Sequence, residues 1–203
     1  MPTAREALLD AAVRALADRP WRTVRMVDVA ALAGVSRQTL YNEFGTKGGL
    51  ATALLRQAAD GYLTGVDRAL AAPVPERPAA VAHWTVRAAR EDPLVKGLLT
   101  GVWGEGLPRP GSEVPGPAQL LVLARDRMVA ASYPAASRSA AAVRCERALR
   151  LALSCVIVPC PPPAGGSRQW VEPDSWSPIT PRITSEIDTS FSVETTSSRK
   201  TMP

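Results

Sequence analysis

The sequence has few of the residues from which metal sites and nucleophilic active sites are built. It contains one histidine, His83, and three cysteines, Cys145, Cys155 and Cys160, which lack paired CxxC spacing. A single histidine excludes most histidine-based metal sites and leaves a catalytic triad without support. An odd number of cysteines without that spacing indicates neither a disulfide framework nor a zinc site. We therefore expect buried or incidental thiols, no metal, no cofactor and no enzymatic activity.

Long apolar segments are also missing. No run of about 18 uninterrupted apolar residues occurs, and the N-terminus lacks a basic segment followed by a long apolar core. The sequence therefore predicts a soluble cytoplasmic protein without a membrane partner. The net charge of +5 favours a polyanionic partner, but many basic proteins have none, so charge only supports this interpretation.

Proline is absent between Trp21 and Ala72, although the chain contains 19 prolines. This absence permits an uninterrupted helical stretch. Within it, Gly34 suits the left-handed turn that ends a helix, and Ser36 suits the N-cap of the next one. A break this short between two helices is typical of a helix-turn-helix motif.

The second helix of this motif has two unlike faces. Successive side chains rotate by about 100°, so Leu40 and Phe44 share a face that can pack on the preceding helix. The other side chains are polar, with Gln38, Thr39 and Asn42 on the opposite face and Arg37 and Tyr41 along its edges. Short amides and hydroxyls suit base edges in a major groove, whereas an arginine and a tyrosine hydroxyl suit phosphates. A helical hairpin with a solvated polar face is the alternative.

The stretch AALAGVSRQTLYNEFGTKGGL, residues 30–50, resembles the DNA-binding motif of the tetracycline-repressor (TetR/AcrR) family. The shared features are a small-residue helix, a Gly-Val-Ser turn, a Thr-Leu-Tyr core, a following phenylalanine and a Gly/Ser-Lys step into a fourth helix. The similarity covers roughly Thr3 to Leu63, and Thr39-Leu40-Tyr41 with Phe44 and Lys47 is a specific combination. We therefore predict DNA contacts by Arg37, Gln38, Thr39, Tyr41, Asn42 and Lys47.

The resemblance implies an all-α fold. A three-helix helix-turn-helix domain would be joined by a long fourth helix to a C-terminal helical domain for ligand binding and dimerisation. The first helix should start at the capping box Thr3-Ala4-Arg5-Glu6 and stop at Asp18-Arg19-Pro20. Where the family places Ser or Thr before the second helix, this chain has Arg25. Either Thr23 caps an earlier start, which we favour, or Arg25 contacts a phosphate.

The fourth helix is predicted to begin after Thr46 as N-cap. Lys47 at its start can meet a phosphate, assisted by the free amides and the positive dipole end of the helix; a solvated lysine is the alternative. Gly48 and Gly49 replace the charged residues usual in the family, and each costs about 1 kcal/mol relative to alanine inside a helix. We therefore expect the first turn to fray without DNA.

A proline-rich segment, AAPVPERP at 71–78, predicts a joint between domains. We expect four parts: a helix-turn-helix DNA-binding domain over 1–50, a connecting helix over 51–72, a helical regulatory and dimerisation domain over 73–163, and a polar tail over 164–203. The tail contains 14 serines or threonines, no leucine and no sustained helical periodicity, so we expect it to be irregular or disordered.

Beyond the joint the pattern predicts further helices over 79–90, 94–103, 118–132 and about 137–158, with an irregular segment at 104–117. Apolar residues surround much of the last helix, so it should lie centrally or face another subunit. The resemblance implies that the last two helices form a four-helix dimer bundle. Several apolar residues could line an effector pocket or form the core instead: Trp84, Leu98, Leu99, Trp103, Leu121 and Met128.

The main hypothesis is a homodimeric transcriptional regulator, usually a repressor, which a small-molecule effector releases from a double-stranded DNA operator. A DNA-binding protein without an effector, constitutive or architectural, is the first alternative. An enzyme is the second, and it would have to depend on residues such as His83 or Cys155. The sequence offers such an enzyme no nucleophile beside a base and no recognisable phosphate-binding loop.

Overall fold

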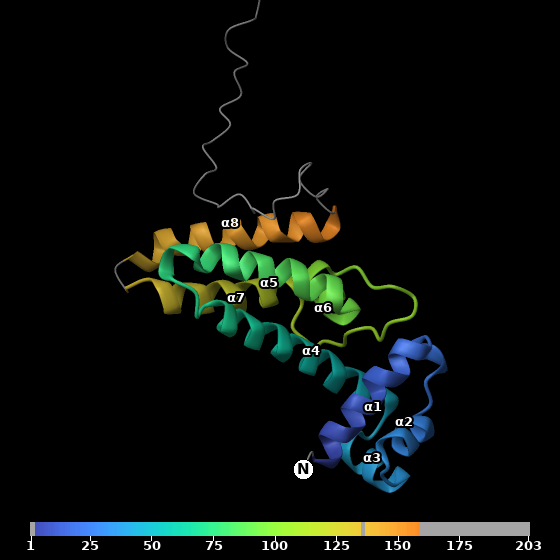
Figure 1. The fold of residues 1–203 in the computed structure, drawn as a ribbon. Coiled ribbons are helices and arrows are strands. Elements are labelled where there is room, and N and C mark those ends of the chain that lie inside the picture. The colour runs from blue at the N-terminus through green and yellow to red at the C-terminus, as the bar shows by residue number, and fades with distance from the viewer. Residues whose placement is uncertain (1–2, 135–136, 159–203) are drawn as a thin grey trace, which may run out of the picture. The chain divides into compact units, whose positions relative to one another are not determined.

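The computed structural model describes residues 3–134 and 137–158. In these ranges the chain forms α-helices and two 3₁₀ turns and contains no strand, which confirms the expected all-α fold (Figure 1). The helices are α1 (Ala4–Asp18), α2 (Met26–Ala33), α3 (Arg37–Phe44), α4 (Lys47–Ala69), α5 (Arg77–Glu91), α6 (Pro93–Thr100), α7 (Pro117–Ser132) and α8 (Arg138–Ile157), and the turns are η1 (Trp21–Thr23) and η2 (Val74–Glu76).

Helices α1, α2 and α3 pack against one another, and α1 and α3 also contact α4. We call residues 3–50 the head. The predicted capping box begins α1, because the Glu6 amide donates to Thr3 Oγ1 at 3.2 Å and the Thr3 amide donates to Glu6 Oε2 at 2.8 Å. Gly34 ends α2 in the left-handed conformation, with φ of 69°, and Ser36 caps α3. The predicted helix-turn-helix is therefore present.

The start of α2 differs from the expectation. Thr23 belongs to η1, where its hydroxyl donates to the Pro20 carbonyl at 2.8 Å. Helix α2 begins at Met26 with Arg25 in the N-cap position and no side-chain cap. The prediction that Thr23 caps α2 is wrong, because the backbone turn that follows Pro20 closes separately and uses the Thr23 side chain.

Helix α4 begins at Lys47, and Thr46 caps it by accepting from the Gly49 amide at 3.1 Å. A Cβ added at Gly49 would lie 2.0 Å from the Phe44 carbonyl oxygen, whereas one at Gly48 would meet only Thr46 Oγ1, at 3.5 Å. At Gly49 a side chain would not fit, because α4 starts close against the end of α3. The interpretation of both glycines as merely a loss of helix stability is therefore wrong at Gly49. Fraying of this turn stays a prediction.

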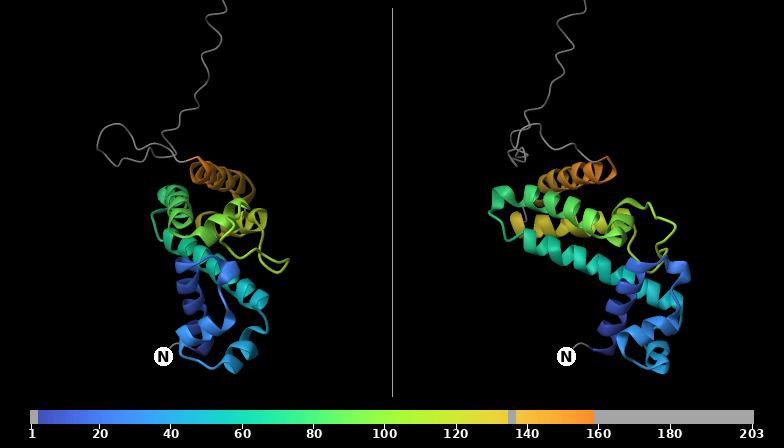
Figure 2. Two further views of the ribbon diagram at one scale, coloured as in Figure 1. Left: turned by 90° about the vertical axis from the view of Figure 1, so that its right-hand side faces the viewer. Right: turned by 45° about the vertical axis from the view of Figure 1, so that its right-hand side comes forward.

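Helix α4 continues from the head to the regulatory helices, the name we give to α5, α6, α7 and α8 (Figure 2). It contacts α5, α6 and α7, and α8 packs on α5 and α7 from the other side. Gly65 allows the close contact with α5, because a Cβ there would lie 2.0 Å from the Trp84 ring. The boundaries predicted for the domains stay predictions.

The end of α6 is also corrected. The helix stops at Thr100 because Gly101 takes a left-handed conformation with φ of 74°, so the predicted end at Trp103 is wrong. Trp103 instead folds back onto Gly97, where a Cβ would lie 2.7 Å from its ring. The chain then runs without regular structure to α7, as predicted. Predictions for Cys160 and for residues 164–203 lie outside the described residues.

Within the described ranges no helix is long and apolar enough to cross a membrane. Among those same residues, no three or more His, Cys, Asp or Glu side chains are grouped so that they could hold a metal ion.

Candidate nucleic-acid interface and regulatory pocket

Helix α3 has the two faces that its sequence predicts. Leu40 and Phe44 are buried in the core of the head. Gln38 and Asn42 are exposed, while Thr39 is half-buried at the start of the helix. The amides therefore face away from the protein interior, as a role in reading base edges requires.

Hydrogen bonds orient these polar side chains before any DNA is bound. The Thr39 amide donates to Ser36 Oγ at 3.0 Å, and the two hydroxyl oxygens lie 2.8 Å apart. Gln38 Nε2 donates to Asn42 Oδ1 at 2.8 Å across one helical turn. The amide pair still offers an acceptor, Gln38 Oε1, and a donor, Asn42 Nδ2, which is the combination that reads an adenine edge.

Lys47 lies at the start of α4, beside the η1 turn. Its ammonium donates to the Arg22 carbonyl at 3.1 Å and lies 5.3 Å from the centroid of the Trp21 ring. Burial lowers the pKa of Lys47. The lysine is thus held in place rather than freely solvated, and two of its three N–H donors remain for a phosphate.

Arg37 and Tyr41 are exposed along the edges of α3. Glu43, the acidic residue of α3, is paired with Arg5, whose guanidinium lies 3.5 Å from its carboxylate and 4.8 Å above the Phe44 ring. This pairing reduces the repulsion that a carboxylate would exert on DNA phosphates. It joins α1 to the end of α3.

The sequence analysis did not identify Trp21, and it gave a phosphate contact by Arg25 only as the less favoured alternative. Arg25 is exposed at the N-terminus of α2, where its side chain makes no cap, so the alternative of a phosphate contact remains as a proposal. Trp21 has no sequence signal that identifies it, because its contact with Lys47 joins residues far apart in the chain.

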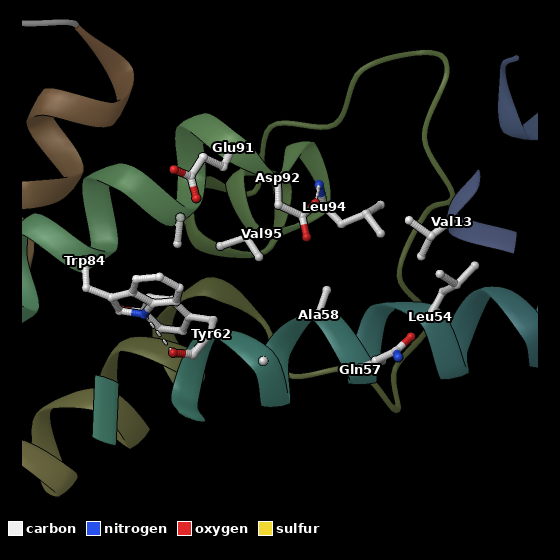
Figure 3. Close-up of a pocket in the computed structure, with 12 residues that line it drawn as sticks. Val13, Leu54, Gln57, Ala58, Tyr62, Trp84, Glu91, Asp92, Leu94 and Val95 are labelled. Atoms are coloured by element: carbon white, nitrogen blue, oxygen red, sulfur yellow. Dashed lines mark hydrogen bonds between the residues drawn. The ribbon is translucent and has the colours of Figure 1, made fainter. Parts of the chain in front are cut away.

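A half-open pocket of about 310 Å³ lies between α4, α5 and α6, with Val13 of α1 at one end (Figure 3). It is lined by Val13, Leu54, Gln57, Ala58, Gly61, Tyr62, Trp84, Glu91, Asp92, Leu94 and others. Asp92 is engaged in capping α6, since it accepts from the Leu94 amide at 2.7 Å. The walls are otherwise mostly apolar, which suits an apolar small molecule.

Among the residues suggested for an effector pocket, Trp84 alone lines this one. Leu98, Leu99 and Met128 are fully buried in the core. Trp103 and Leu121 pack against that core as partly buried side chains. Trp84 also borders a second pocket of about 350 Å³, beside Arg68, His83 and Arg87.

Comparisons with known proteins identify the head. The sequence model of the family described as bacterial regulatory proteins, tetR family, matches residues 8–54. The HTH-type transcriptional regulator AlkX of Mycobacterium tuberculosis is 41% identical over 103 residues, which are 48% of either chain. The chain therefore spans about half the length of this curated relative.

A crystal structure of the TetR family repressor AlkX from Dietzia sp. strain DQ12-45-1b, implicated in biodegradation of n-alkanes, was also found. It is 24% identical with a TM-score of 0.45, and the match covers 79% of this chain and 87% of that one. The family model spans most of α1, all of α2 and α3, and the first turns of α4. The head is therefore similar to the N-terminal domain of the tetR family of bacterial regulatory proteins.

Proposed function

We propose that the protein is a transcriptional regulator that binds operator DNA with α3 in the major groove. The observation that carries this proposal is the exposed Gln38–Asn42 amide pair, held above a buried Leu40 and Phe44 in a head that matches the family. The name of the curated relative, a helix-turn-helix transcriptional regulator, supports it. In this proposal Thr39 adds to base contacts, and Arg37, Tyr41 and Lys47 contact phosphates.

The regulator would act as a homodimer. Two copies would place their α3 helices in successive major grooves about one duplex turn apart, on an operator with matching near-twofold symmetry. Exposed apolar side chains on α7 and α8 support a contact between copies: Val122 and Leu123 on α7, Val143 and Leu151 on α8.

A small molecule bound in the pocket between α4, α5 and α6 would release the operator. The pocket supports this because Val13 of the head and Leu94 of α6 both line it, so a ligand there would press on both. The ligand must prefer the conformation that fits DNA poorly, by the same free energy with which DNA opposes the ligand. Regulation without an effector is the competing proposal.

The test begins with selection of bound fragments from a random duplex pool, followed by binding to the selected operator and to a random duplex across salt concentrations. Gln38→Ala and Asn42→Ala should each lose sequence preference, by about 1–3 kcal/mol per lost base contact. Lys47→Ala should weaken binding to both duplexes alike and lower the salt slope by about one. Lys96→Ala, which removes an exposed lysine on α6, is the charge-matched control and should change neither.

Equal losses on both duplexes for all three head variants would contradict the assignment of the amides to bases. Salt-dependent binding by the wild-type protein without any selected sequence would favour a DNA-binding protein that reads no operator.

A further inference from the structure

The loop at 101–116, between α6 and α7, reaches from the regulatory helices to the head. We call it the strap. Near the start of the strap, the Trp103 ring packs against Gly97 of α6. Near its end, Val114 is buried in the core. Because both ends are fixed in the regulatory helices, a shift of α6 moves the strap with it.

Two sets of hydrogen bonds tie the strap to the segments that carry the DNA-binding surface. The Trp21 amide donates to the Gly106 carbonyl at 2.7 Å. Arg56 of α4 donates to the Glu113 carbonyl through Nε at 3.3 Å and Nη2 at 3.2 Å, and Nη2 also lies 3.2 Å from Glu113 Oε2. The strap therefore bonds to the η1 turn through Trp21 and to α4 through Arg56.

Trp21 connects this strap to Lys47. Its backbone amide donates to Gly106 of the strap, while its ring lies under the Lys47 ammonium. This ammonium also donates to the neighbouring Arg22 carbonyl. A displacement of η1 would thus remove both contacts that hold the lysine. The same α6 that leads into the strap also contributes Leu94 and Val95 to the pocket.

We propose that the strap sets the position of Lys47 through Trp21, so that movement of α6 changes how the head binds phosphate. Trp21 is a positioning residue: it touches no DNA but orients a side chain that does. The proposal rests on the proposed function, since it assumes that Lys47 contacts a phosphate, but the ties of the strap to Trp21 and Arg56 can be tested without DNA.

The first experiment measures binding to the selected operator and to a random duplex for Trp21→Leu, Trp21→Phe, Lys47→Ala and the Trp21→Leu/Lys47→Ala double variant. Trp21→Leu should weaken both duplexes about 3- to 10-fold and lower the salt slope by about one, the loss expected of one phosphate contact. Trp21→Phe, which keeps a ring, should recover most of the affinity. In the Lys47→Ala background, Trp21→Leu should have no further effect.

The second experiment measures hydrogen exchange at the Trp21 amide in the protein without DNA. Arg56→Gln should speed this exchange and weaken DNA binding, because the strap loses one of its ties. Arg90→Gln, which removes an exposed arginine on α5, should do neither. Circular dichroism of each variant verifies the helical fold.

Additive effects of Trp21→Leu and Lys47→Ala would overturn the positioning role, and so would a loss of sequence preference in Trp21→Leu. If hydrogen exchange at the Trp21 amide is unchanged in Arg56→Gln, the bond between Arg56 and the strap does not help to hold Trp21, and this part of the proposal fails. A wild-type protein that binds no duplex would refute the proposed function instead, and the exchange measurement would still decide whether the strap holds Trp21.

Discussion

At the scale of single residues, Gly48 and Gly49 look alike in the sequence but differ in the structure. Gly49→Ala should destabilise the protein by about 1–3 kcal/mol, because its methyl group would overlap the Phe44 carbonyl oxygen. Gly48→Ala is the matched control and should be neutral or stabilising by up to about 1 kcal/mol, since alanine favours a helix and finds space there. Urea unfolding of both variants measures the difference, and equal stabilities would contradict the close approach.

The residues that sequence reasoning placed correctly are those whose roles are local. Thr3, Ser36 and Thr46 each cap a helix through an amide three residues away, so the neighbouring sequence is sufficient to identify them. The roles of Gly49 and Trp21 depend on segments that only the fold brings together. Sequence pattern alone therefore could not assign them.

At the scale of helices, the sequence pattern predicted every α-helix in the described ranges, but it predicted the positions of the helix ends less accurately. The stop at Gly101 was missed because the apolar pattern continues through Val102 and Trp103, although the backbone turns away before them. The pocket was missed for a related reason. Its walls come from α1, α4, α5 and α6, and no single helix shows a periodicity that marks it.

The contact between α4 and α5 gives an element-scale prediction about pH. Tyr62 Oη lies 3.0 Å from Thr85 Oγ1 in the core, and burial raises the pKa of Tyr62 to about 12, an effect that this hydrogen bond partly opposes. The unfolded chain, with a tyrosine pKa of about 10, loses the proton first as pH rises. The free energy of unfolding should therefore be unaffected by this group below about pH 10 and fall by roughly 3 kcal/mol at most towards pH 12.

Urea unfolding at about pH 9 and about pH 11 tests this prediction. Tyr62→Phe should lack this part of the fall, because phenylalanine has no proton to lose. Tyr41→Phe, which changes an exposed tyrosine on α3, should keep the wild-type pH dependence. If Tyr62→Phe loses as much stability as the wild-type protein over this interval, burial of the Tyr62 hydroxyl does not control the alkaline transition.

At the scale of the whole molecule, the pocket, the strap and the proposed DNA-binding surface form one connected path. Helix α6 lines the pocket and leads into the strap, and the strap bonds to Trp21 beside Lys47. In the proposed mechanism, such a path would give an effector two ways to act. It would change the separation of the two heads of a dimer, and it would loosen a phosphate contact within each head.

The dimer proposal depends on apolar side chains that the single chain leaves uncovered. Leu151 on α8 is 43% exposed and Val143, earlier on the same helix, is 59% exposed. Leu151→Glu would bury a charge in the contact between copies, so it should yield monomers at micromolar concentration in sedimentation velocity and weaken operator binding. Val74→Glu alters a side chain that is 48% exposed on η2 and should leave the dimer intact. A wild-type protein that sediments as a monomer, or a Leu151→Glu variant that remains dimeric, would remove α8 from the contact.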